Sequence, residues 1–350
     1  MMDKKSFENS KILIVGGAGF VGSNLTKLLL KENENIGIVV VDNLLSSEKE
    51  NLPMDHRLQF LKGSITDEDI LKHIDDSFDY VFHLATYHGN QSSIHDPLAD
   101  HANNTLTTLK LFNHMKNFKR LKKVVYSAAG CSCAEKTFDK ACATDEDAPI
   151  SLIQDSPYSM SKIFGEFYAV YFHRQHGLPT VRARFQNVYG PGEVLGAGEW
   201  RGTPATVWRN VTPTFVYKAL KNLPLPLENE GIATRDFIYV EDICQGLMAC
   251  ALKGEPGDVY NLGSGKETSI ADLAEKIKRI SGSQSEIQYL PRRAWDHSGK
   301  RFASIEKARR ELGFEVKIDL DQGLKQTIDW ARDNIEFIEK CMSKHADKMT

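Results

Sequence analysis

The sequence lacks an excess of charge of either sign, and it lacks any long apolar run. Lys plus Arg number 44 against 47 for Asp plus Glu, which gives a formal net charge of −3. A chain with this balance has no broad basic field to attract nucleic acid or an anionic membrane surface. No segment approaches the roughly 20 apolar residues of a membrane-spanning helix. We therefore expect a soluble protein with neither nucleic acid nor membrane as partner.

Cysteine is scarce, and the N-terminus lacks a secretory pattern. The chain has six cysteines in 350 residues, and its start, MMDKKSFENSKILIVGG, has only a short apolar run that ends in glycines. A secretory signal needs a longer apolar stretch and a small-residue cleavage site. These features predict a cytoplasmic protein with reduced thiols. Cys131, Cys133 and Cys142 lack a paired CxxC or a nearby His couple, so loop or buried thiols are favoured over zinc, and no metal is expected.

The first half of the chain alternates short apolar runs with helical patterns. Such alternation is typical of parallel strands joined by crossover helices that cover both faces of the sheet. The predicted strands are 12–15, 36–41, 58–61, 80–84, 123–127 and 181–185, and the helices include 24–31, 103–115 and 158–173. The predicted fold class is α/β, with a Rossmann-type doubly wound parallel sheet and a smaller α/β C-terminal substrate domain.

The texture of the sequence changes beyond residue 190. The segment 190–213 is rich in Gly, Pro, Thr and Trp, and long irregular loops in compact domains are commonly functional. We predict a dinucleotide-binding domain over 10–185 and a substrate-binding domain over 186–345. Within the second, we expect 233–262 to return to the sheet of the first.

Three glycines follow the first predicted strand directly, and a helical pattern begins at once. Gly16, Gly19 and Gly22 permit a tight turn, a close approach of backbone N–H groups to a pyrophosphate, and near contact of helix with strand. Asp42 closes the next predicted strand, 20 residues after Gly22. A carboxylate there accepts hydrogen bonds from a ribose 2′-hydroxyl and repels a 2′-phosphate, so the pattern predicts NAD rather than NADP.

Tyr158 and Lys162 stand four residues apart in a predicted helix, so both side chains lie on one face. A phenol is a poor base at neutral pH, but a nearby ammonium and a positive nicotinamide ring both favour its ionised form. Tyr158 can then take or return a hydroxyl proton while a hydride moves between substrate and cofactor. A solvent-facing pair is the common alternative for YxxxK on a helix.

Several motifs in order resemble the extended short-chain dehydrogenase/reductase family, in its NAD-dependent nucleotide-sugar epimerase and dehydratase branch, similar to UDP-glucose 4-epimerase. These motifs are the glycine stretch at 16–22, FHLA at 82–85, YxxxK at 158–162, NVYGP at 187–191, RDFIYVED at 235–242 and YNLG at 260–263. The resemblance covers nearly the whole chain. It implies oxidation of a nucleotide-linked sugar at C4, with UDP favoured, followed by return of the hydride to the changed sugar. It also implies a homodimer.

The resemblance implies residue roles as well. Asn187 and Arg235 would approach the nucleotide diphosphate, and the segment of Arg293 and Asp296 would close the nucleotide pocket. An arginine fork suits phosphate oxygens, although a surface ion pair for Arg235 and a turn-capping amide for Asn187 remain alternatives. The other implied cofactor-binding residues are Phe20, Val21, Asn43, Ser64, Ile65, Leu84, Ala85 and Thr86, with Tyr158 and Lys162.

The sequence departs from the family at the end of the fifth strand. Relatives place a Ser or Thr hydroxyl where this chain has Ala128 or Ala129, so Ser127 or Ser132 is the candidate substitute. Cys131 is a candidate for moving a proton beside a ketone, by partial resemblance of this stretch and of GEWRG (198–202) to sugar 3,5-epimerases. A small buried thiol is the favoured alternative for Cys131.

Two further departures concern the walls of the pocket. Ser64 stands where relatives present an Asp to adenine, so we expect adenine recognition to depend more on the backbone. The segment 86–93 is assigned to sugar contacts, and His88 within it is expected to be a pocket-wall residue more than an acid or base.

The leading hypothesis is an epimerase. The alternatives are a C4 dehydrogenase or a dehydratase of the same family that moves protons through Cys131 or Glu135. A non-catalytic sensor that binds NAD is the hypothesis from a different class, and Tyr158 with Lys162 argues against it.

Overall fold

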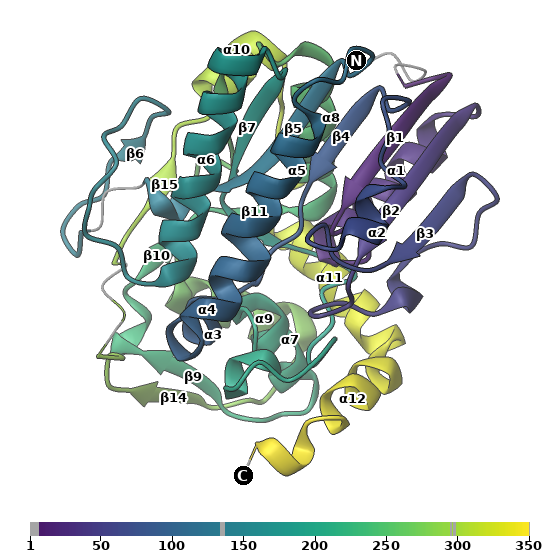
Figure 1. Cartoon of the computed structure of the whole chain (residues 1–350). Helices are drawn as coiled ribbons and strands as arrows, with labels where there is room; N and C mark the ends of the chain where they lie inside the picture. The colour runs from purple at the N-terminus through teal and green to yellow at the C-terminus, as the bar shows by residue number, and fades with distance from the viewer. Residues whose placement is uncertain (1–6, 134–136, 295, 297–298, 350) are drawn as a thin grey trace.

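A seven-stranded parallel sheet organises the first part of the chain (Figure 1). The computed structural model describes residues 7–133, 137–294, 296 and 299–349. The strand order is β12-β7-β5-β4-β1-β2-β3, and every neighbouring pair is parallel. The strands are β1 (Ser10–Val15), β2 (Ile36–Asp42), β3 (Leu58–Lys62), β4 (Tyr80–His83), β5 (Lys123–Ala129), β7 (Thr180–Phe185) and β12 (Val259–Leu262).

Apolar helices bury both faces of this sheet, which is why its strands are almost continuous apolar runs. On one face the core includes residues of α1 (Phe20–Glu32) and α8 (Val240–Lys253). On the other face it includes residues of α5 (Thr107–Met115) and α6 (Pro157–His176). The order of the strands reverses between β1 and β4, and ligands of doubly wound sheets bind at such a switch point. The α/β fold-class prediction is confirmed.

The second part of the chain forms small two-stranded sheets and helices around them. Its strand pairs are β8 (Asn187–Tyr189) with β11 (Phe237–Tyr239), β9 (Leu225–Glu228) with β14 (Ile287–Leu290), β10 (Thr234–Arg235) with β13 (Thr268–Ser269), and β15 (Phe302–Ala303) with β6 (Ala143–Thr144) from the first part. The larger helices are α7 (Val211–Leu220), α9 (Ile270–Ser281), α11 (Leu320–Asp333) and α12 (Ile335–Ser343), with α10 (Glu306–Leu312) beside α8. The apolar faces of α7, α9 and α11 pack on one another.

The segment 233–262 divides between the two parts. β12 pairs with β7 and becomes the edge strand of the large sheet. β11 instead pairs with β8, in a two-stranded sheet separate from the large one. Only the later part of the segment therefore joins the sheet.

Helix α6 is defined at both ends by its sequence. Ser156 is the N-cap, and its hydroxyl oxygen accepts a hydrogen bond from the Ser159 N–H at 3.3 Å. Pro157 follows at the first helical position, where its fixed φ fits the helix and its missing N–H is harmless. Gly177 ends the helix in the left-handed conformation with φ 69°. These signals fix the helix that carries Tyr158 and Lys162.

Helix α6 packs very closely against strand β5 at Gly165. An ideal Cβ on Gly165 would lie 1.9 Å from the Tyr126 hydroxyl oxygen. Tyr126 is fully buried and its hydroxyl donates toward the Lys162 carbonyl oxygen at 3.5 Å. The glycine therefore sets how deeply α6 sits against the sheet.

We expect Gly165→Ala to lower the free energy of unfolding by about 1–3 kcal/mol, as overpacking of a close contact does. Urea unfolding followed by circular dichroism measures this. Gly37→Ala is the matched control, since a Cβ on Gly37 meets no atom within 4 Å. Equal stability of the two variants would contradict the packing described.

Candidate active site

The glycine loop after β1 leaves room for backbone to approach a ligand. Gly16 has φ +83°, and an ideal Cβ on it would lie 2.5 Å from the Ala85 nitrogen. A Cβ on Gly22 would lie 2.4 Å from the Gly16 carbonyl oxygen. Gly19 is the N-cap of α1 and supplies no capping side chain. The start of α1 therefore fits a pyrophosphate, which the N–H groups and dipole of a helix N-terminus favour.

Asp42 fastens this loop to the end of β2. Its carboxylate accepts hydrogen bonds from the Ala18 N–H at 3.0 Å, the Leu44 N–H at 2.9 Å and the Ser47 hydroxyl at 3.0 Å. Burial raises the pKa of Asp42, and these hydrogen bonds act in the opposite direction. Asp42 thus positions the glycine loop, in addition to the ribose contact that the sequence predicts.

The other predicted cofactor residues surround the same end of the sheet. Ser64 accepts hydrogen bonds from the N–H and hydroxyl of Thr66, at 3.1 Å and 2.8 Å. The hydroxyl oxygen of Thr86 is buried without a hydrogen-bond partner, as expected of a group that faces a ligand site. Ile65 and Leu84 are buried, Phe20, Val21 and Ala85 are partly buried, and the exposed Asn43 side chain donates to Asn103.

Lys162 lies beneath Tyr158 and is held by the end of β5. Its Nζ donates to the Ser127 carbonyl oxygen at 2.9 Å and lies 3.5 Å from the Ser127 hydroxyl oxygen. The same Nζ lies 6.0 Å from the centroid of the Tyr158 ring. Lys162 is only 4% exposed, so its ammonium is held in place. The i, i+4 pair is therefore directed into the protein and is not the solvent-facing alternative.

Helix α3 and the loop before it border Tyr158. The Tyr158 N–H donates to the Ser93 hydroxyl of α3 (Asn90–His95) at 3.1 Å. The His88 ring packs edge-on against the Tyr158 ring with centroids 6.1 Å apart. Burial, with the charges of Arg209, Arg201 and Lys162, lowers the pKa of His88 to about 3. His88 is neutral near pH 7, which suits a wall residue.

The hydroxyl that the family pattern expects has two candidates. Ser127 lies against Lys162, whereas the Ser132 hydroxyl is buried without a hydrogen-bond partner. The backbone of Cys131 belongs to the turn Gly130–Ser132, but its side chain lies outside the described part of the chain. Glu135 also lies outside the described residues.

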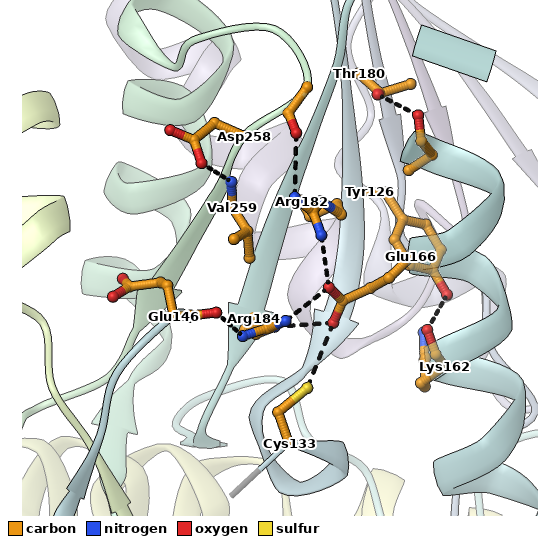
Figure 2. A network of polar contacts seen from close by, with 12 residues as sticks. Tyr126, Cys133, Glu146, Lys162, Glu166, Thr180, Arg182, Arg184, Asp258 and Val259 are labelled. Carbon is orange, nitrogen blue, oxygen red and sulfur yellow. Dashed lines mark hydrogen bonds and ion pairs between the residues drawn. The ribbon is translucent and has the colours of Figure 1, made fainter. Parts of the chain in front are cut away.

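A buried ion-pair network fixes α6 to β7 (Figure 2). The Glu166 carboxylate is bound by Arg184 through two bonds of 2.9 Å and 3.0 Å and by Arg182 at 3.2 Å. Cys133 points its sulfur at the same carboxylate, 3.9 Å away. Arg184 also donates to the Glu146 carbonyl oxygen at 2.8 Å. Glu166 thus joins the helix that carries Tyr158 and Lys162 to strand β7 and to the loop after β5.

Two of the predicted nucleotide-side residues, Asn187 and Arg235, lie on strands β8 and β10 of the second part. The Asn187 N–H donates to the Asp236 carbonyl oxygen at 2.8 Å, next to Arg235. Arg235 donates to the carbonyl oxygens of Thr234 and Gly299, at 2.6 Å and 2.7 Å.

Arg293 and Asp296 lie together as the sequence predicts. Arg293 forms an ion pair with Glu228 at the end of β9, and the Asp296 N–H donates to the Arg293 carbonyl oxygen at 3.2 Å. Arg293 therefore has an acidic partner in this structure.

Sequence reasoning missed Asn104, which ties three elements together. Its side chain accepts from the Tyr87 N–H at 2.6 Å and donates to Asp100 at 2.7 Å and to Ser161 at 3.2 Å. It lies in a π-helical turn, His101–Leu106, where one continuous helix over 103–115 was predicted. The polar run HANN within an apolar pattern is the signal that could have revealed it.

Arg201 and Arg209 were also missed, because an irregular loop gives no sign of burial.

No group of three or more His, Cys, Asp or Glu side chains is placed to hold a metal ion among the residues described. In the same residues, no helix has the length and apolar character needed to cross a bilayer.

A family model described as the NAD dependent epimerase/dehydratase family matches residues 12–263. This chain belongs to that family. It is accordingly an NAD-dependent enzyme of the epimerase/dehydratase class, and the predictions of family and cofactor are confirmed.

Solved structures similar to this chain include the Bordetella bronchiseptica enzyme WbmF in complex with NAD+, at 61% identity over 99% of each chain and a TM-score of 0.88. Its complex with NAD+ and UDP matches at 63% identity over 98% of each chain, with a TM-score of 0.88.

Curated relatives are more distant in sequence. A putative UDP-glucose 4-epimerase of Methanocaldococcus jannaschii is 31% identical over 326 residues, which are 92% of this chain and 99% of the relative. A trifunctional UDP-glucose 4,6-dehydratase, 3,5-epimerase and reductase of Arabidopsis thaliana is 27% identical over 344 residues. This chain spans about half of that relative, 49% of its length.

Acid should destabilise the fold through buried histidine. Burial, aided by the Lys162 charge, lowers the pKa of His83 to about 3, so below the ordinary value of 6.5 the unfolded chain takes up a proton that the folded chain refuses. Stability is complete above pH 6.5 and falls by about 1.4 kcal/mol per pH unit for this group as the pH drops toward 3.

We expect His83→Gln, whose amide retains a hydrogen bond to Thr108, to remove that share of the slope. Urea unfolding at pH 7.0, 6.0 and 5.0 measures it, with His73→Gln as the exposed control. An unchanged slope in His83→Gln would show that this histidine is not the source.

Proposed function

We propose that the protein epimerises a UDP-linked sugar through transient oxidation at C4. The observation that carries the proposal is the pair of Tyr158 and buried Lys162, at the switch-point edge of a sheet whose glycine loop fits a dinucleotide. A sensor has no chemical need for a buried ammonium beside a phenol, since burying a charge without purpose is unfavourable.

The residues of the chain divide the work. Tyr158 removes a proton from the sugar hydroxyl and later returns it. Lys162, held by the Ser127 carbonyl oxygen, provides a fixed positive charge that stabilises the phenolate. Neutral His88 packs on Tyr158 and shields it from water. Ser127 and Ser132 are the hydroxyl groups that would orient the sugar.

Bound NAD supplies the electron acceptor and donor at the sugar carbon. Gly16, Gly19, Gly22 and Asp42 would hold its pyrophosphate and ribose, and Thr86 offers it an unpartnered buried hydroxyl.

Asn187 and Arg235 would hold the nucleotide diphosphate from β8 and β10, with the Arg293 and Asp296 segment closing over the base. The choice of UDP is supported by the solved relative that contains NAD+ and UDP.

Dehydration is the second candidate, since Ala128 and Ala129 depart from the epimerase pattern and the Arabidopsis relative is named in part as a dehydratase. Cys131 or Glu135 would then move protons. A C4 dehydrogenase would instead accumulate reduced cofactor.

The proposal includes a cytoplasmic homodimer. Four large apolar side chains of α6 are 45–53% exposed at spacings of three and four residues: Met160, Phe164, Phe167 and Tyr171. Such a stripe is the face that a second helix pair covers. The six cysteines are compatible with a reducing compartment.

Tyr158→Phe should lose about 100- to 10,000-fold in turnover while retaining bound NAD, because only the proton acceptor is removed. NMR of UDP-sugars in heavy water measures inversion and deuterium uptake, and denaturation releases the dinucleotide for identification. Tyr171→Phe, on the exposed face of the same helix, is the control. Full turnover by Tyr158→Phe would sink the proposal, and loss of water from the sugar would favour the dehydratase.

Phe164→Asp should weaken self-association at least tenfold, since a buried aromatic anchor contributes about 2 kcal/mol or more. Light scattering after size exclusion, over a range of concentrations, measures the dimer. Met54→Asp changes a fully exposed apolar residue outside α6 and should leave the dimer intact. A dimer that tolerates Phe164→Asp would place the interface elsewhere.

A further inference from the structure

Two arginines of the segment between β8 and α7, the buried Arg201 and the partly buried Arg209, have no acidic partner in an ion pair among the residues described. Arg201 is 4% exposed, and its Nε and Nη2 have no hydrogen-bond partner. Its Nη1 lies 3.4 Å from the Leu45 carbonyl oxygen. Arg209 donates to the carbonyl oxygens of Ser46, at 2.7 Å, and Ala197. Backbone oxygens hold the two guanidinium groups in place without neutralising them.

Glu193 and Glu48 act on the charge of Arg209, but among the described residues no carboxylate acts on that of Arg201. Glu193 is buried and accepts a hydrogen bond from Asn210, and burial raises its pKa to about 7. Glu48 is already occupied by Lys344 and by the Gly198 N–H. Burial and the charge of Arg201 lower the pKa of Arg209 to about 9, and burial lowers the pKa of Arg201. A guanidinium keeps its charge in proteins near pH 7, so the site holds two cations. A buried cation without a counter-ion is unfavourable unless a bound anion completes the site.

The position of the pair relates it to the sugar and not to the glycine loop. The charges of Arg201 and Arg209 both act on His88, whose ring contacts Tyr158. Gly202 packs so closely on the His95 ring that a Cβ would lie 2.0 Å from it. His95 ends α3, the helix whose Ser93 binds the Tyr158 N–H. Through Gly202 and α3, the segment that carries Arg201 therefore packs against the residues that border Tyr158.

We propose that Arg201, supported by Arg209, binds a carboxylate carried by the sugar, so that the substrate is a nucleotide-linked uronic acid. The inference rests on the proposed function. The start of α1 serves the cofactor pyrophosphate, and Asn187 with Arg235 serves the nucleotide diphosphate, which leaves this pair for a third anion. On a hexuronate the carboxyl carbon is attached to C5, next to the reacting C4. The paired donors of a guanidinium match the two oxygens of a carboxylate.

The test compares binding of UDP-glucuronate, UDP-glucose and UDP to the holoenzyme by calorimetry, and measures turnover of both sugars separately. We expect the wild type to bind UDP-glucuronate at least tenfold more tightly than UDP-glucose. Arg201→Met should remove that preference and leave UDP and UDP-glucose within about twofold, with NAD content unchanged. Arg201→Lys keeps the positive charge but lacks the paired donors of a guanidinium, so this variant should retain part of the preference for UDP-glucuronate. Arg332→Met, on an arginine that is 55% exposed, is the control.

Other results would overturn the inference. A wild type without preference for the acidic sugar has no carboxylate subsite, and this measurement does not depend on any variant folding. If Arg201→Met weakens binding of all three ligands equally, the two arginines bind the nucleotide diphosphate. If the variant loses its NAD, they bind the cofactor. If binding of UDP-glucuronate is preferred and the preference depends on Arg201, but neither sugar is turned over, the carboxylate subsite is supported and the epimerase proposal is contradicted.

Discussion

The buried carboxylate of Glu166 is the constraint on which the reaction site depends. Arg182 and Arg184 come from β7, and Glu166 comes from the middle of α6, so their ion pairs prevent the helix from sliding along the sheet. Lys162 lies one turn before Glu166, and Tyr158 one turn before Lys162. One fixed point therefore sets the direction of both reactive side chains. A buried network of this kind is satisfied only when every partner is in place, which makes the position of α6 a single, well-defined state.

Most of the fold was predictable because its signals are local. Apolar runs, the glycine spacing and the Tyr158 and Lys162 pair each occupy a few consecutive residues, and the elements on either side of them are also visible in the sequence. The pairing of β11 with β8 was not, because three-residue strands carry no pattern that distinguishes one sheet from another. The π-helical turn around Asn104 was missed for a related reason, since its stabilising contacts come from residues distant in sequence.

The candidate site divides in the same way. The residues that we assign to the cofactor could be proposed from the sequence, because backbone geometry and charge favour glycine and aspartate at such positions. The arginines that we assign to the sugar could not, because they come from an irregular loop whose burial depends on tertiary contacts. Arg201 lies in a stretch without regular secondary structure and is only 4% exposed, and Arg209 after it is partly buried. Because Ala128 and Ala129 stand where relatives have a hydroxyl, the sequence of the fifth strand does not identify the hydroxyl group that positions the sugar.

The loop after Asp42 is also bound to segments that lie far along the chain. The Glu199 N–H donates to the Leu45 carbonyl oxygen at 3.0 Å, Arg209 binds the Ser46 carbonyl oxygen, and Glu48 is shared by Gly198 and Lys344. The loop after Asp42, the segment 197–209 and the end of α12 are thus held together by bonds between distant parts of the chain. Several of these bonds must break together before the loop after Asp42 can open, so its opening is a cooperative event and not the independent movement of one short segment.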